Sequence, residues 1–219
     1  MELSQSTLLP VLPVLLVGAA YLLGSLAFAV LVSRVMGLAD PRTFGSQNPG
    51  ATNVLRSGSK VAAVSTLLLD ALKGYVPVAV VLAYGTNVSW VGDAVAWASL
   101  AGLAAFLGHL YPVFFRFKGG KGVATAVGFL FGLEPALGLA CLATFLIVAY
   151  FSRYVSLASV VAAVFAPFYW LFGHGVVWQA GAVSVACLVV MAVMLIWRHR
   201  ANLARVMDGS ESKLGAKKA

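Results

Sequence analysis

Charged residues are scarce in this chain, and their scarcity excludes an ordinary soluble fold. Of 219 residues, 10% are Asp, Glu, Lys or Arg, whereas 61% are hydrophobic, and the mean hydropathy is +0.95. A soluble domain carries about 25% charged residues. The composition therefore predicts an integral membrane protein that crosses the lipid bilayer several times.

Cysteines and acidic residues are also few. Cys141 and Cys187 lie inside apolar runs, where they form neither a zinc motif nor a disulfide framework. Seven acidic residues stand against 15 basic ones, for a net charge of +8. In a membrane protein such an excess of basic residues is typical of loops that set the topology in the bilayer and of sites that bind anionic lipids or substrates. We therefore expect no nucleic acid partner. Glu2 is the only charge before Arg34, so the first apolar run is expected to be a retained span and not a cleaved signal peptide.

Seven apolar runs follow one another along the chain. They cover Leu8–Val35, Val61–Tyr84, Ala94–Phe115, Val123–Leu133, Ala136–Phe151, Val155–Phe172 and Val176–Trp197. A transmembrane helix needs about 20 residues. The fourth run is much shorter, because its residues rise only ~16 Å as a helix. The topology depends on whether this run is a helix of its own.

Basic residues decide between six and seven spans. One span through Glu134-Pro135 would give six spans with both termini on one side, whereas two helices meeting there would give seven. With seven, every basic residue except Lys73 falls on one side: Arg34, Arg42, Arg56, Lys60, Arg116, Lys118, Lys121, Arg153, Arg198, Arg200, Arg205, Lys213, Lys217 and Lys218. The opposite loops carry Glu2, Asp93 and Glu134. Because cytoplasmic loops are rich in Lys and Arg, we expect seven transmembrane helices, with the N-terminus outside and the C-terminus cytoplasmic. We expect one all-α domain over residues 1–219, with residues 198–219 as a cytoplasmic segment.

The stretch Arg116–Thr125, called the glycine stretch below, separates the third and fourth runs. It contains three glycines and three cations. Glycines allow successive N–H groups to face one anion, and a helix beginning at Val123 would point its positive end at the same place. The stretch indicates a phosphate site, although a basic turn between helices is the alternative. The spacing is not that of a Walker A loop, so no nucleotide chemistry is inferred. If the following helix is short, the stretch must lie below the membrane interface.

Residues Gly45–Arg56, called the polar segment, lie between the first two runs. Serine, threonine and two asparagines precede a single arginine there. Such donors suit a polyol phosphate, because hydroxyls bond Ser and Asn while phosphate takes a bidentate Arg. The alternative is a turn-rich loop, because turns use the same residues.

Other polar residues lie within or beside the spans. Asp70 and Lys73 are three residues apart on one helix face, which indicates either a functional site or a neutral pair that shapes the bundle. His109 precedes the glycine stretch and is typical of a structural donor. His199 and Asn202 would share a face if the last helix continued past Trp197. The Gly128-x-x-x-Gly132 pair favours ordinary helix packing.

Several catalytic patterns are missing from the sequence. It contains no H-x-x-x-x-D, no Gly-x-Ser-x-Gly elbow and no carboxylate pair of the glycosidase kind. The predicted cytoplasmic face is therefore rich in anion donors and poor in bases and nucleophiles.

Three motifs together resemble a known family. The polar segment, Lys118–Thr125 and the His199/Asn202 segment resemble, in order and on one predicted face, the bacterial acyl-phosphate-dependent glycerol-3-phosphate acyltransferases, the PlsY family. The resemblance covers nearly the whole chain. It includes Asp70-x-x-Lys73-Gly74 and Gly108-His109-x-x-Pro112.

The resemblance implies acyl transfer from acyl phosphate to the 1-hydroxyl of glycerol 3-phosphate, giving lysophosphatidic acid and phosphate. This is the first acylation of bacterial phospholipid synthesis. The expected setting is the bacterial inner membrane, with the site facing the cytoplasm and no metal, cofactor or obligate protein partner. Acyl phosphate is already activated, so positioning and charge stabilisation would suffice without a protein nucleophile.

The resemblance also assigns roles. Lys121, Ser46, Arg56, His199 and Asn202 are the expected catalytic residues. One phosphate is assigned to Lys118, Gly119, Gly120, Lys121, Gly122 and Thr125. Glycerol 3-phosphate is assigned to Ser46, Asn48, Asn53 and Arg56, and support to Asp70, Lys73 and His109.

A transporter or channel for a phosphorylated metabolite is the alternative function. The intramembrane Asp70/Lys73 pair and the glycine-broken helix suit that role. Against it, the sequence shows no inverted repeat, and its polar motifs gather on one predicted face.

Overall fold

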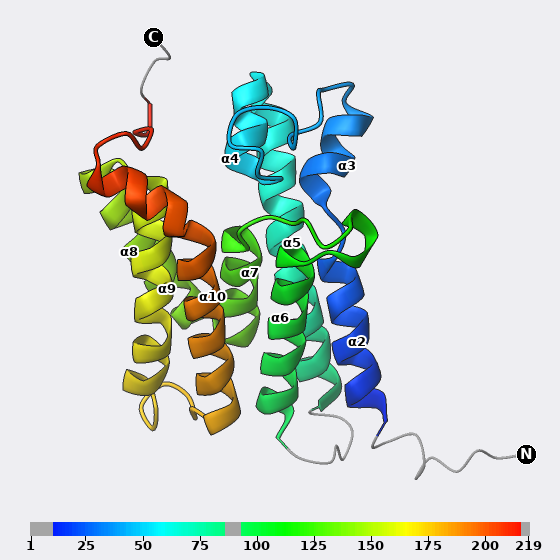
Figure 1. The fold of residues 1–219 in the computed structure, drawn as a ribbon. Helices are drawn as coiled ribbons and strands as arrows, with labels where there is room; N and C mark the ends of the chain where they lie inside the picture. The colour runs from blue at the N-terminus through cyan, green and yellow to red at the C-terminus, as the bar shows by residue number, and fades with distance from the viewer. Residues whose placement is uncertain (1–10, 86–92, 216–219) are drawn as a thin grey trace, which may run out of the picture. The chain divides into compact units, whose positions relative to one another are not determined.

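The computed structural model describes residues 11–85 and 93–215 (Figure 1). The sequence positions Glu2, Leu8, Lys217 and Lys218 lie outside these residues. Within them the chain is helical, and the only extended pairing is an isolated bridge between His174 and Trp178. This confirms the all-α class. The chain divides into two compact units, Met1–Leu133 and Glu134–Ala219, described separately below. The single domain over 1–219 stays a prediction.

The first unit is built from four longer helices and shorter pieces. These are α2 (Leu12–Gly24), α3 (Phe28–Val35), α4 (Ala51–Val54), η1 (Leu55–Ser57), α5 (Lys60–Gly85), α6 (Ala94–Leu110), η2 (Val113–Phe115) and α7 (Val123–Leu133). Helices α2, α5 and α6 run side by side in Figure 1, and α7 packs against α5 and α6.

The first apolar run is broken, contrary to the single run expected over Leu8–Val35. Helices α2 and α3 are bent by 47° at a short break. The chain leaves the first helix at Gly24, and Ser25 donates its N–H back to Tyr21. The break frees the Leu26 carbonyl from a regular helical ladder, so another group can bind it.

Glycines bring the helices of this unit into backbone contact. A Cβ added to Gly24 would overlap the Ala105 carbonyl, and one added to Gly128 would overlap the Ala71 carbonyl. These positions join α2 to α6 and α5 to α7. The packing role predicted for Gly128 and Gly132 is confirmed, because Gly132 also lies against α5.

Helix α7 has the predicted bounds, and α8 (Pro135–Ser152) begins directly after it. The Glu134 side chain accepts the Ala136 N–H as an N-cap, and Pro135 occupies the first turn. Because N-caps and prolines start helices, this pair ends one helix and begins the next. The predicted break at Glu134-Pro135 is confirmed.

The start of α7 lies part-way along α5, while the position of the glycine stretch below the membrane interface stays a prediction. Thr125, in the first turn of α7, lies against Gly74, near the middle of α5. The distance along α5 from Lys60 to Gly74 is about 20 Å at 1.5 Å per residue. Helix α7 therefore begins well below the end of α5 that carries the polar segment.

The second unit contains α8, α9 (Val155–Phe172) and α10 (Ala182–Met207), with α9 packed against both others. The run expected at Val176–Trp197 is wrong at both ends. Trp178 stacks on Trp170 with ring centroids 5.1 Å apart and donates its indole N–H to the Trp170 carbonyl, so this apolar segment is a turn. At its other end α10 continues to Met207, so His199 and Asn202 lie on a helix as expected.

Fewer helices of the described chain meet the length and composition of a membrane span than the seven that the sequence predicted. In the described residues five helices are long and apolar enough to cross a membrane, or six if α2 and α3 form one span. Helix α7 is shorter than this limit. A seventh span therefore depends on whether α7 completes a crossing from its recessed start.

Candidate active site

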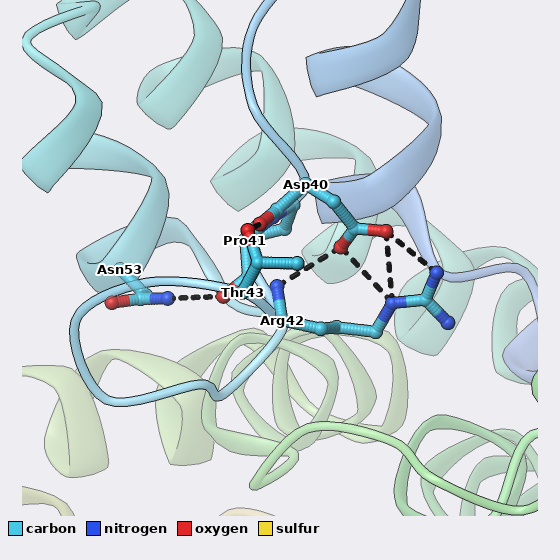
Figure 2. Close-up of polar contacts among 5 residues, drawn as sticks. All are labelled: Asp40, Pro41, Arg42, Thr43 and Asn53. Carbon is cyan, nitrogen blue, oxygen red and sulfur yellow. Dashed lines mark hydrogen bonds and ion pairs between the residues drawn. The ribbon is translucent and has the colours of Figure 1, made fainter.

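Asn53 organises the polar segment from a buried position. It is 2% exposed, and its side-chain Nδ2 donates to the carbonyls of Pro41, at 2.6 Å, and Phe44, at 3.1 Å. Figure 2 shows the amide turned into the loop toward Pro41. Its Oδ1 accepts the Ser46 N–H at 3.0 Å. A single side chain thus fixes three points of the loop.

Two predicted substrate residues meet at this amide. The Arg56 Nη1 lies 3.5 Å from the same Asn53 Oδ1 that accepts the Ser46 N–H. Gly45 has φ +59°, and a Cβ there would overlap this oxygen. Ser46 and Arg56 are both exposed, whereas Asn48 is half-buried in the same loop. The structure therefore brings Ser46, Asn53 and Arg56 together at one amide oxygen, and Asn48 lies in the loop between them.

Asp40 and Arg42 begin the same loop with an exposed ion pair. The Arg42 Nη2 lies 2.6 Å from Asp40 Oδ2 (Figure 2), and hydrogen bonds from Arg42 hold the pKa of Asp40 below its ordinary value. The Arg42 guanidinium also lies 5.7 Å from the ring centroid of Phe115, just before the glycine stretch. This cation–π contact joins the residues that precede the polar segment to the residue that precedes the glycine stretch. Sequence reasoning missed it, although the Asp-x-Arg spacing was visible.

The glycine stretch packs against the end of α6. The Gly120 N–H donates to the His109 carbonyl at 3.1 Å, and a Cβ on Gly120 would overlap the imidazole Nε2. A Cβ on Gly119 would overlap the same carbonyl, and Gly122 has φ +87° against the ring of Phe106. These glycines are therefore required by close packing and by backbone conformation. Whether their N–H groups also hold an anion stays a prediction.

Polar side chains of the stretch differ in exposure. Lys118 is exposed and Lys121 is half-buried. Thr125 is fully buried in the α5–α7 contact, and among the described residues its Oγ1 has no hydrogen-bond partner. In this structure Thr125 therefore serves packing, and its contact with a phosphate stays a prediction.

Asp70, Lys73 and His109 form a buried cluster below the glycine stretch. The Lys73 Nζ lies 2.8 Å from Asp70 Oδ1, and the His109 Nδ1 lies 3.5 Å from the same oxygen. Lys73 also donates to the Leu26 carbonyl at 2.7 Å. The predicted pairing of Asp70 with Lys73 is confirmed, and His109 joins it.

The third motif lies in the second unit. His199 is 3% exposed, with Nδ1 2.9 Å from the Leu195 carbonyl. Asn202 donates from Nδ2 to the Glu211 carboxylate at 2.6 Å. Thus the polar segment and the glycine stretch belong to the first unit, while His199 and Asn202 belong to the second.

Glu211 fastens the tail that follows α10. Its carboxylate also accepts the Ser156 hydroxyl at 2.9 Å and the Arg205 Nε at 2.8 Å. Burial raises the pKa of Glu211, but the bonds from Asn202, Ser156 and Arg205 outweigh this and leave the pKa below its ordinary value. Sequence reasoning gave this residue no role. The available signal was its rarity, as one of few acids in a basic tail.

The profile of the family described as "Glycerol-3-phosphate acyltransferase" matches residues 14–209. The chain belongs to this family. A glycerol-3-phosphate acyltransferase of Albidiferax ferrireducens is 61% identical over 90% of this chain and 87% of its own. One of Bordetella petrii is 57% identical over 93% of each chain.

Two solved structures have the same fold. Both are described as PlsY (YgiH), an integral membrane glycerol 3-phosphate acyltransferase. The glycerol 3-phosphate form has a TM-score of 0.82 at 38% identity and covers 93% of this chain and 96% of its own. The lysophosphatidic acid form has a TM-score of 0.80 at 37% identity, covering 93% and 95%. The chain is therefore an all-helical integral membrane protein of the PlsY type.

Proposed function

We propose that this chain transfers an acyl group from acyl phosphate to the 1-hydroxyl of glycerol 3-phosphate, releasing lysophosphatidic acid and phosphate. The observation that carries the proposal is the contact between residues that flank its two predicted substrate motifs. Ser46 and Arg56 meet at Asn53, and the Arg42–Phe115 contact joins their loop to the glycine stretch. The related structures in glycerol 3-phosphate and lysophosphatidic acid forms support the same reaction. Family membership favours this enzyme over the transporter.

Two anions must be held close together for the transfer. Arg56 offers a bidentate fork for the phosphate of glycerol 3-phosphate, and Ser46 offers a hydroxyl for the glycerol. Lys121 supplies a full charge beside glycines whose N–H groups suit a second phosphate. The family resemblance assigns Asn202 and His199 a part in the same reaction. Such a constellation accelerates transfer by positioning and by stabilising charge that develops on the acyl carbonyl and leaving phosphate.

The chemical step then needs no covalent enzyme intermediate. The 1-hydroxyl attacks the acyl carbon, its bond to the phosphate oxygen breaks, and the hydroxyl proton passes to an oxygen of the departing phosphate. Neither a metal nor a cofactor takes part in this proposal. The recessed start of α7 suits a donor with a polar head and a fatty tail, because the phosphate site lies beside apolar helices.

Seven spans and a cytoplasmic site in the bacterial inner membrane complete the proposal. The basic residues of both described loops in the first unit fit the cytoplasmic side. A cysteine replacing Glu134, in a background lacking Cys141 and Cys187, should react with an impermeant thiol reagent outside intact cells. A cysteine replacing Ser210 should react only after lysis, and labelling of Ser210 from outside would contradict seven spans.

Donor choice tests the function. Purified protein in detergent should form lysophosphatidic acid from glycerol 3-phosphate and acyl phosphate, without acyl-CoA, acyl carrier protein or divalent metal. Chelator should leave the rate unchanged. Equal or faster turnover with acyl-CoA would refute the donor assignment. No turnover with any donor would contradict the enzyme and favour the transporter.

A further inference from the structure

Asp70 and Lys73 lie inside α5 and are almost completely buried. Their side chains are 3% and 1% exposed, respectively. An ion pair removed from water carries a desolvation cost that its attraction often fails to recover, and apolar residues of similar volume are often as stabilising. Stability alone is therefore a weak reason for this pair. The backbone groups that it contacts indicate a more specific role.

Lys73 reaches the break between α2 and α3. Its ammonium donates to the Leu26 carbonyl at 2.7 Å and lies 5.5 Å from the ring centroid of Phe28, the first residue of α3. The break is where the chain turns toward the polar segment. A charged donor on this carbonyl therefore fixes the direction in which α3 leaves the bundle.

His109 connects the same carboxylate to the glycine stretch. Its Nδ1 lies 3.5 Å from Asp70 Oδ1, a buried polar contact that is longer than an ordinary N–H···O hydrogen bond. Its carbonyl accepts the Gly120 N–H, and its Nε2 lies where a Cβ of Gly120 would be. The imidazole ring therefore lies directly beside the backbone at Gly120.

We propose that Asp70 is a positioning residue for the phosphate site. Through His109 it sets the place of the glycine stretch, and through Lys73 it sets the α2–α3 break that leads to the polar segment. One buried carboxylate thereby holds the two motifs in register. This inference rests on the proposed function, because it takes the glycine stretch as part of the substrate site.

The His109 arm is tested by two variants that leave the Asp70–Lys73 pair intact. His109→Asn keeps an amide donor near the position of Nδ1, whereas His109→Leu removes every polar atom of the ring. His109→Leu should raise KM for glycerol 3-phosphate or acyl phosphate several-fold, because it removes the polar ring that lies between Asp70 and Gly120. His109→Asn should recover most of that loss.

A purely structural histidine would give a different result. Both variants would then lower the amount of folded enzyme, while the surviving enzyme would keep its KM values. Equal KM values for wild type, His109→Asn and His109→Leu would overturn the positioning role.

The double variant Asp70→Asn/Lys73→Met separates positioning from mutual neutralisation. It removes both charges together, so neither is left unpaired in the bundle. If the pair serves only to neutralise itself, the double variant should recover wild-type KM and amide exchange in residues 116–122. If Asp70 positions the stretch, amide exchange there should accelerate on the order of tenfold, while exchange in α9 stays unchanged. Ser159→Ala, another buried polar side chain, in α9, should change neither quantity.

Lys121→Ala distinguishes failure of this inference from failure of the proposed function. If Lys121→Ala leaves turnover intact, the glycine stretch is not the phosphate site and the functional proposal fails. A second outcome is that Lys121→Ala is inactive while the His109 variants keep wild-type KM values and the Asp70→Asn/Lys73→Met variant keeps wild-type amide exchange. In that case only the positioning role is refuted. The exchange measurement needs no activity, so it remains decisive in either case.

Discussion

His109 contacts Gly120 in two ways: its carbonyl accepts the glycine N–H, and its imidazole occupies the space of a Cβ. The glycine is therefore not only a flexible point in a loop. It is the residue that allows the loop backbone to lie directly on a buried side chain. Any side chain at this position must move the loop, the imidazole or both.

Gly120→Ala should therefore reduce activity mainly by raising KM for a phosphate substrate. The added methyl group would overlap the imidazole, so the loop must shift away from α6. Steady-state kinetics on purified protein would measure the effect. Gly18→Ala is the control, because nothing lies within 4 Å of its Cβ and its activity should match wild type. A Gly120→Ala enzyme with wild-type KM values would show that the loop tolerates the shift.

Lys121→Ala should be the most damaging single change in the glycine stretch. It removes a full charge where two phosphates are proposed to meet. A hydrogen bond to a charged group is worth roughly 1.5–3 kcal/mol, or about 10–150-fold in rate if it forms in the transition state. The exposed Lys60, at the start of α5, offers a control: Lys60→Ala should keep full turnover. Comparable rates for the two variants would remove Lys121 from the catalytic group.

Asn53→Asp should destabilise the polar segment, although asparagine and aspartate are almost equal in size. An aspartate would place a carboxylate oxygen against the carbonyls of Pro41 and Phe44, which now accept from Nδ2. The cost of such unsatisfied groups is about 1–3 kcal/mol. Thermal unfolding in detergent would detect it, with the exposed variant Thr52→Ala as a control expected to lie within about 0.5 kcal/mol. Wild-type stability combined with weaker glycerol-3-phosphate binding would assign Asn53 to the substrate alone.

Glu211→Gln should weaken the tail in a pH-dependent manner. The folded-state pKa of Glu211 is lowered, so its charged form adds stability above the unfolded-state pKa of about 4.3. That stability is lost as pH falls through the lowered folded-state pKa. The difference in thermal stability between wild type and Glu211→Gln should thus be full at pH 7 and vanish in stronger acid. A stability difference between wild type and Glu211→Gln that persists in strong acid would show that the charge of Glu211 is not what stabilises the tail.

Local patterns in the sequence predicted most of the helices. The bounds of α7 and α9 agree with the expected runs because Pro135 and the polar pair Ser152-Arg153 mark changes of element. The run at Val176 failed, because hydropathy records apolar character and not helical backbone. Trp178 is apolar, yet its indole binds a carbonyl in a turn.

Tertiary contacts account for what the sequence could not predict. The break at Leu26 has no proline, and its carbonyl accepts from Lys73, 47 residues away, as well as from the neighbouring Phe28 N–H. Asn53 was assigned to substrate because an exposed and a buried amide look alike in a sequence. The burial of Asn53 depends on how its own loop folds back on it. The contact between Arg42 and Phe115 joins two segments that are distant in the sequence.

The most direct test of transfer without a protein nucleophile is rapid quench of purified protein with labelled acyl phosphate, followed by mass spectrometry of the intact chain. Ser46 is the only serine of the three motifs and has no His–Asp partnership among the described residues, so it is expected to bind substrate. In the absence of glycerol 3-phosphate the chain should keep its unmodified mass, and lysophosphatidic acid should appear only when both substrates are present. A stoichiometric acyl adduct on Ser46 that passes its chain to added glycerol 3-phosphate would contradict direct transfer.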